Sequence, residues 1–137
     1  MQIFAGVFGA VFALTGILGF VPGITSMYGD LGFAGRGSHA ELLGLFQISV
    51  AHNIVHLLFG VGLLAARKAS TARLYLIVGG ALYLVVGLYG SIIDRGGAAN
   101  FLPFNYADNV LHFGLSLTMV ALGIVGGVLY KRSRATA

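Results

Sequence analysis

The chain has 137 residues, of which 58% are hydrophobic and only 9% are charged, and it contains no cysteine. An ordinary soluble domain carries about 25% charged residues, so this composition argues against a typical water-soluble surface and favours a membrane protein. The lack of cysteine excludes disulfides and thiol catalysis. The formal net charge of +4 comes from short basic flanks and not from a patch, which argues against a nucleic-acid partner.

Four apolar segments follow one another, at about residues 3–21, 43–66, 74–93 and 107–130. Each is long enough to cross a hydrocarbon core of about 30 Å as a helix. Lipid offers no partner for backbone amides, so segments that cross it are expected to be helical. The sequence therefore predicts an all-α fold in a single domain, residues 1–137, built as a four-helix transmembrane bundle. The Gly-rich connection of residues 22–42 is expected to be a flexible surface loop.

Charged residues sort to the two sides of these segments. Six of the eight lysines and arginines lie between the second and third segments or after the fourth: Arg67, Lys68, Arg73, Lys131, Arg132 and Arg134. All four acidic residues lie on the opposite side: Asp30, Glu41, Asp94 and Asp108. The positive-inside rule then predicts a multi-pass membrane protein with both termini in the cytoplasm.

The two halves of the chain repeat a pattern of small, aromatic and polar residues. The first and third segments share Gly9, Phe12, Gly16 and Gly19 with Gly80, Tyr83, Gly87 and Gly90, and the second and fourth share Asn53 and His56 with Asn109 and His112. This pattern predicts two parallel helical-hairpin repeats related by an axis along the membrane normal. Equivalent residues would then face one another: His56 and His112, Asn53 and Asn109, His52 and Asp108.

Six polar side chains in the second and fourth segments form the candidate site: His52, Asn53, His56, Asp108, Asn109 and His112. Ionisable groups within a membrane segment are costly, usually face the interior and mark functional sites. The first interpretation is an interhelical polar network that fixes the register of the helices without any ligand.

The same histidines could instead bind a cofactor. Histidines from two membrane helices can supply both axial ligands of a b-type haem, and His56 and His112 form the natural pair, with His52 as an alternate ligand. Metal binding by the three histidines with Asp108 is another alternative, because imidazole and carboxylate suit zinc or iron. A proton relay and a quinone contact also remain open. No residue is assigned to catalysis, because neither a nucleophile elbow nor a phosphate-binding loop occurs.

Two stretches around these residues carry a resemblance that spans nearly the whole chain. They are His52-Asn53-Ile54-Val55-His56-Leu57-x-x-Gly60 and Pro103-x-Asn105-x-Ala107-Asp108-Asn109-Val110-Leu111-His112. They resemble the signature blocks of a bacterial four-helix integral membrane family, domain of unknown function 4383. The chain departs from the family pattern at Ser49-Val50-Ala51, where the family resemblance leads us to expect an Asn-Pro-like step. The resemblance implies a protein of the bacterial inner membrane and implies no activity.

The expected function is that of a small, non-enzymatic accessory or structural subunit. It would sit among membrane lipids and pack against other integral membrane proteins or copies of itself, for example in a photosynthetic or respiratory energy-transducing complex. Abundant small residues motivate this expectation, because they let helices approach closely in lipid. No cofactor is favoured, and a b-type haem or a metal at His56 and His112 is the alternative.

Overall fold

The computed structural model describes residues 1–136, except for the side chain of Arg134, and most of these residues are helical. The helices are α1 (Gln2–Leu18), α2 (Val50–Phe59), α3 (Gly62–Ala65), α4 (Ala69–Ile92) and α5 (Tyr106–Ala135). The connection after α1 holds the strands β1 (Thr25–Ser26), β2 (Glu41–Leu42) and β3 (Phe46–Gln47) and the 3-10 helix η1 (Tyr28–Asp30). The mostly helical prediction is confirmed, but the three short strands depart from an all-α fold.

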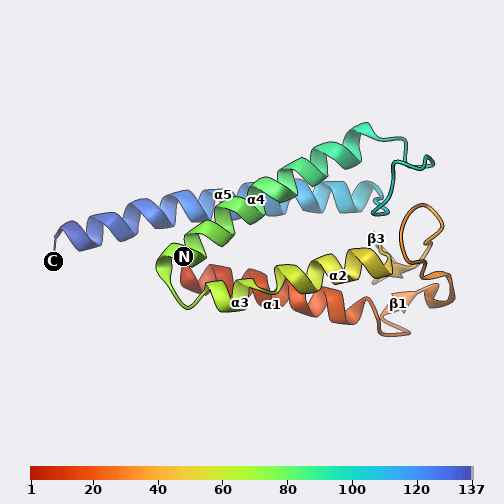
Figure 1. Ribbon diagram of the computed structural model, residues 1–137, viewed down its shortest axis with the longest axis horizontal. Coiled ribbons are helices and arrows are strands. Elements are labelled where there is room, and N and C mark those ends of the chain that lie inside the picture. The colour runs from red at the N-terminus through yellow and green to blue at the C-terminus, as the bar shows by residue number, and fades with distance from the viewer. Residues whose placement is uncertain (137) are drawn as a thin grey trace.

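The helices form two hairpins that lie side by side (Figure 1). In the first hairpin α1 packs against α2 and α3, and in the second α4 packs along α5. The connections of residues 19–49 and 93–105 lie at one end of the molecule, here called the outer end, and the turn of residues 66–68 lies at the inner end. The start of α1 is also at the inner end, because Gln2 donates from Nε2 to the carbonyl oxygen of Ala66 at 3.1 Å. The last part of α5 projects beyond that end (Figure 1).

Small and aromatic residues fill the space between the hairpins. One buried cluster draws on α1, α4 and α5 and consists of Ala5, Phe12, Ala72, Leu76, Tyr83 and Met119. Glycines bring helices together elsewhere, since a Cβ atom at Gly9 would lie only 2.4 Å from the backbone nitrogen of Leu63. Such close approach of backbones is how helices pack when the surroundings are apolar.

The second apolar segment begins later than the predicted residue 43. Leu43 and Gly44 have φ angles of 57° and 65°, which a right-handed helix does not allow. They form the turn between β2 and β3 of a three-stranded antiparallel sheet in the order β1-β2-β3. The predicted flexible loop is therefore held in part by this sheet, and α2 starts only at Val50.

The same segment is interrupted between α2 and α3. After α2 ends at Phe59, the amide of Leu63 bonds to the carbonyl of Gly60, three residues back. The Phe59 carbonyl instead accepts a hydrogen bond from the hydroxyl of Tyr75 on α4, at 2.9 Å. Gly62 makes room for that ring, because a Cβ atom there would lie 2.5 Å from it. The interruption thus ties the first hairpin to the second.

Within the described residues, two helices are long and apolar enough to span a membrane, judged by length and composition: Ala69–Ile92 and Tyr106–Ser133. Two further apolar stretches, Gln2–Leu18 and Val50–Ala65, are shorter. The hairpins therefore differ in length, and the longer helices belong to the second.

Candidate functional site

Three histidines meet in the interior near the outer end, and we call them the histidine cluster. His52 and His56 lie one turn apart on α2 with ring centroids 4.8 Å apart. His112 on α5 places its ring centroid 6.3 Å from that of His52. The three side chains, in chain order, are only 4%, 7% and 3% exposed. The structure thus brings these three predicted site residues together from both hairpins.

Polar caps at the outer end fix where α2 and α5 begin. The hydroxyl oxygen of Ser49 accepts from the backbone nitrogen of His52 at 3.1 Å. Asn105 accepts from the backbone nitrogen of Asp108 at 3.0 Å, and the Asp108 carboxylate accepts in return from that of Asn105 at 2.8 Å. These caps satisfy amide groups that a helix start leaves free. They set the register that carries the histidines into the interior.

Aromatic rings surround the histidine cluster. Phe104 and Tyr83 lie edge-on to His112, with centroids 5.2 Å and 5.3 Å away. Phe12 lies 5.8 Å from His56 and stacks on Tyr83 at 5.1 Å. Sequence reasoning did not include these rings in the site. The available signal was that Phe12 and Tyr83 occupy the same position in the internal repeat.

The histidine cluster has hydrogen-bonding capacity that the chain leaves unused. The Nδ1 atoms of His52, His56 and His112 are buried and have no hydrogen-bond partner among the described residues. A neutral imidazole carries one donor and one acceptor nitrogen, and leaving a buried one unmatched costs about 1–3 kcal/mol. Buried polar atoms are mostly paired in proteins, so three unpaired nitrogens in one place call for an explanation.

Two cavities border the histidine cluster, and all three histidines line both of them. The first, of about 160 Å³, also meets Phe59, Tyr83 and Phe104, and we call it the aromatic cavity. The second, of about 120 Å³, also meets Leu42 and Asp108. Both are smaller than the pockets of about 300–1,000 Å³ that hold drug-sized ligands. The cluster is therefore accessible to small groups only.

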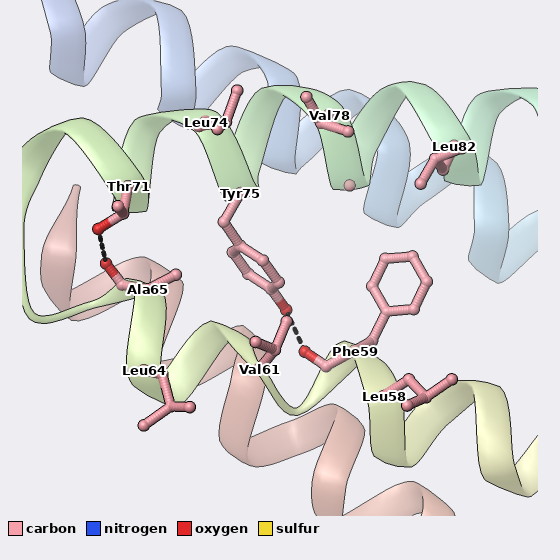
Figure 2. A pocket seen from close by; sticks show the side chains of 11 residues that line it. Leu58, Phe59, Val61, Leu64, Ala65, Thr71, Leu74, Tyr75, Val78 and Leu82 are labelled. Carbon is pink, nitrogen blue, oxygen red and sulfur yellow. Dashed lines mark hydrogen bonds between the residues drawn. The ribbon is translucent and has the colours of Figure 1, made fainter.

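An apolar groove of about 560 Å³ runs along the outside of the molecule between α2–α3 and α4 (Figure 2). Its walls are Leu58, Phe59, Val61, Leu64, Ala65, Thr71, Leu74, Tyr75, Val78, Gly79 and Leu82. The hydroxyls of Thr71 and Tyr75 already donate to the carbonyls of Ala65 and Phe59, as the dashed lines in Figure 2 mark. The groove therefore offers an almost wholly apolar surface.

Asn53 and Asn109 each lie against a glycine of their own hairpin. A Cβ atom at Gly19 would lie 2.2 Å from Oδ1 of Asn53, and one at Gly90 would lie 2.1 Å from Oδ1 of Asn109. Asn109 donates to the carbonyl of Gly90 at 2.8 Å, whereas both amide atoms of Asn53 lack a partner among the described residues. The two asparagines occupy equivalent places but are not equally satisfied.

The six predicted polar residues do not hydrogen-bond to one another through their side chains within the described part of the chain. Asp108 lines the smaller cavity beside the histidines, but its carboxylate accepts from the backbone nitrogens of Asn105 and Gln47. These bonds hold the carboxylate at the start of α5. Among the described residues, no group of three or more histidines and acidic residues could hold a metal ion. The metal ligand set considered from the sequence is therefore not assembled.

The haem interpretation of His56 and His112 stays a prediction. Both residues line the same two cavities, of about 160 Å³ and 120 Å³. A tetrapyrrole is at least drug-sized and needs a pocket of about 300–1,000 Å³. Haem binding between these residues would therefore require the two hairpins to move apart.

Comparison with known proteins gives a family but no activity. The family described as "Domain of unknown function (DUF4383)" matches residues 2–125, which is nearly the whole chain and includes every member of the histidine cluster. No curated protein and no solved structure matches the chain.

Proposed function

The chain belongs to the DUF4383 family, and we propose that it is a small integral membrane protein that acts as a non-enzymatic accessory subunit. Its four helical segments, with α2 and α3 counted as one, cross a bacterial inner membrane as a bundle. Both termini lie in the cytoplasm. Its outward helix faces pack against other integral membrane proteins, for example in an energy-transducing complex.

The main support for the membrane placement is the distribution of polar and apolar side chains, which is the inverse of that in a water-soluble protein. Large apolar side chains point outward on every long helix, for example Ile3 on α1, Val85 on α4 and Leu117 on α5, which are 80%, 62% and 75% exposed. Polar side chains are buried instead, including those of the histidine cluster, Asn53, Asn109 and Asp108. A monomer in water rarely exposes apolar faces of this extent, whereas polar groups inside a membrane protein face its interior.

The charges at the two ends support the orientation. The turn between α3 and α4 carries Arg67 and Lys68, and the end of α5 carries Lys131 and Arg132, all at the inner end. The acidic residues lie in or beside the connections at the outer end. The positive-inside rule assigns the basic end to the cytoplasm.

The shorter helices of the first hairpin fit the same arrangement. Irregular backbone at membrane depth is tolerated where protein buries it. At the outer end Ala40, Leu42 and Ile48, which lie in or beside the short sheet, form a second buried cluster. The sheet is bonded to the second hairpin, since Asn105 donates from Nδ2 to the Leu45 carbonyl at 2.7 Å. The sheet can thus complete a crossing that the helices leave short.

An exposed stripe on α5 is the surface on which we base the accessory role. It consists of Val110, Gly114, Leu117, Ala121, Ile124 and Val128, all of which are exposed. Their spacing of four and three residues is that of a helix–helix seam. A Cβ atom at Gly114 would meet nothing within 4 Å, so none of the described residues fills the space beside it. Small residues in such a seam let a partner helix approach in lipid.

Extraction from the native membrane in a gentle detergent tests this proposal. We expect the wild-type chain to migrate as part of a larger assembly, and Ala121→Leu to release it. Ala81→Leu is the matched control, because it makes the same change at an exposed position of α4 and should leave the assembly intact. A wild-type chain recovered only as a free monomer would contradict the proposal.

A further inference from the structure

We propose that an open pocket at the inner end, here called the basic pocket, binds the headgroup of an anionic phospholipid. The pocket lies where the start of α1, the start of α4 and the last part of α5 come together (Figure 1). The proposal rests on the membrane placement argued above, because the cytoplasmic leaflet would supply the lipid. It does not depend on the accessory role, which uses the exposed stripe on α5.

Three cationic side chains from two parts of the chain line the basic pocket. Lys68 and Arg73 lie at the start of α4, and Lys131 lies on α5. The sequence shows these residues as two separate basic flanks, and the fold joins the flanks around one space of about 450 Å³. That volume is typical of pockets that hold small ligands. Cations that converge on one open pocket attract an anion, and phosphate oxygens accept strong hydrogen bonds from them.

The acidic side chains of the chain cannot neutralise the basic pocket. All four belong to the outer end, in η1, in β2, after α4 and in the first turn of α5: Asp30, Glu41, Asp94 and Asp108. The described lining of the pocket accordingly includes neither aspartate nor glutamate. Positive groups that share one space repel one another, and a negatively charged ligand relieves that repulsion. The pocket therefore calls for an anion from outside the chain.

Two adjacent glycines of α5 form the floor of this region. A Cβ atom at Gly127 would lie 2.5 Å from Nε of Arg73, and one at Gly126 would lie 2.2 Å from Cγ of Met1. Because these side chains are missing, the guanidinium of Arg73 and the start of α1 lie directly against α5. A guanidinium held in this way loses less freedom when a ligand binds, and its planar donors match a phosphate.

A neighbouring pocket favours a lipid over a free phosphate. This second open pocket, of about 440 Å³, shares Met1, Ala69 and Tyr130 with the basic pocket. The rest of its lining mixes polar and apolar side chains, among them Gln2, Ser133, Phe4, Leu122, Val125 and Leu129. Such a mixed surface suits the glycerol esters and the first acyl carbons that follow a lipid headgroup. Basic pockets between membrane helices on the cytoplasmic side are known to hold anionic headgroups.

Native mass spectrometry of the full chain in detergent micelles tests the proposal by counting bound lipids. Dioleoyl phosphatidylglycerol is compared with dioleoyl phosphatidylcholine, which has the same acyl chains and a headgroup without net charge. We expect one phosphatidylglycerol per chain, bound about tenfold more tightly than phosphatidylcholine. Glycerol 3-phosphate in excess should not displace the lipid, because it lacks the acyl chains that the second pocket contacts.

Two double variants separate the basic pocket from the general charge of the inner end. Arg73→Gln with Lys131→Gln removes two cations of the pocket and should weaken phosphatidylglycerol binding about 25-fold, on the order of fivefold for each cation. Arg67→Gln with Arg132→Gln is the matched control, because it removes two cations of the same end that line neither pocket. It should bind like the wild type. All four side chains are exposed, and helical circular dichroism checks that both variants fold.

Three results would overturn the proposal. Equal weakening by the two double variants would mean that the lipid responds only to the total charge of the inner end. Equal affinities for the two lipids would mean that the charge of the headgroup is not recognised. Displacement by glycerol 3-phosphate would make the pocket a site for a soluble phosphate compound. Failure of the membrane placement would look different, because the chain would then be recovered outside the membrane fraction before any lipid is added.

Discussion

The two hairpins place equivalent residues of the repeat at their shared interface but differ in the length of their helices. Phe12 and Tyr83, at equivalent positions of the repeat, stack on each other with centroids 5.1 Å apart. Ser49 and Asn105 cap α2 and α5 at equivalent positions. Yet α1 and α2 have 17 and 10 residues, whereas α4 and α5 have 24 and 30. The repeat therefore accounts for the contact between the hairpins and for the helix caps, but it does not set the lengths of the helices.

The difference in helix length also affects the hydrogen bonds of the buried asparagine in each hairpin. In the second hairpin α4 continues past Gly90 to Ile92, and Asn109 donates to the Gly90 carbonyl in its last turn. In the first hairpin α1 ends at Leu18, before the equivalent Gly19, and Asn53 makes no side-chain hydrogen bond among the described residues. The first hairpin keeps the packing geometry of the repeat but not its hydrogen bond.

The largest predicted difference between the hairpins concerns equivalent glycines. A Cβ atom at Gly9 would lie 2.4 Å from the backbone nitrogen of Leu63, whereas one at Gly80 would meet the side chain of Val120 at 2.7 Å and backbone atoms only at 3.0 Å. Backbone atoms can yield less than a methyl group, so Gly9→Ala should lower the free energy of unfolding by about 3 kcal/mol and Gly80→Ala by about 1 kcal/mol. Unfolding by SDS in mixed micelles, followed by helical circular dichroism, measures both. Equal losses would mean that the two interfaces are equally tight.

A smaller contrast is expected at the asparagines. Asn109→Leu removes the hydrogen bond to Gly90 and should cost about 1–2 kcal/mol. Asn53→Leu has a similar shape and removes two unpaired buried groups, so it should be neutral or stabilising. The same unfolding experiment distinguishes the two. A loss at Asn53 as large as that at Asn109 would mean that Asn53 has a partner after all and that the hairpins are alike.

The smallest predicted effect concerns the interruption between α2 and α3 in the first hairpin. Tyr75→Phe leaves the Phe59 carbonyl without the hydroxyl that now bonds to it, and it should cost about 1 kcal/mol. Tyr106→Phe, at a residue that is 73% exposed, serves as the control and should change stability by less than about 0.5 kcal/mol. If the two changes had equal effects, the bond from Tyr75 would not hold the interruption.

Much of this interior was predictable from the sequence, because it follows from residue type and spacing. The positions of His52, His56 and His112 at helical spacing indicated a shared interior site, and the repeat indicated that it would draw on both hairpins. The turn at Leu43 and Gly44 was not predictable from the apolar pattern, since Leu43 is a common helix residue and its left-handed conformation depends on the sheet around it. The contacts of Asn53 and Asn109 with a glycine of their own hairpin were not predicted either, because the sequence pattern does not show which neighbouring helix each side chain meets.

Cysteine labelling tests most directly whether the chain crosses the membrane with its inner end in the cytoplasm. The chain has no cysteine of its own, so Gly37→Cys in the outer connection and Ser70→Cys at the inner end each provide a single reactive site, and both positions are exposed. A membrane-impermeant maleimide added to intact spheroplasts should label Gly37→Cys but reach Ser70→Cys only after lysis. Labelling of Ser70→Cys in intact spheroplasts, or recovery of the chain outside the membrane fraction, would contradict the proposed membrane bundle.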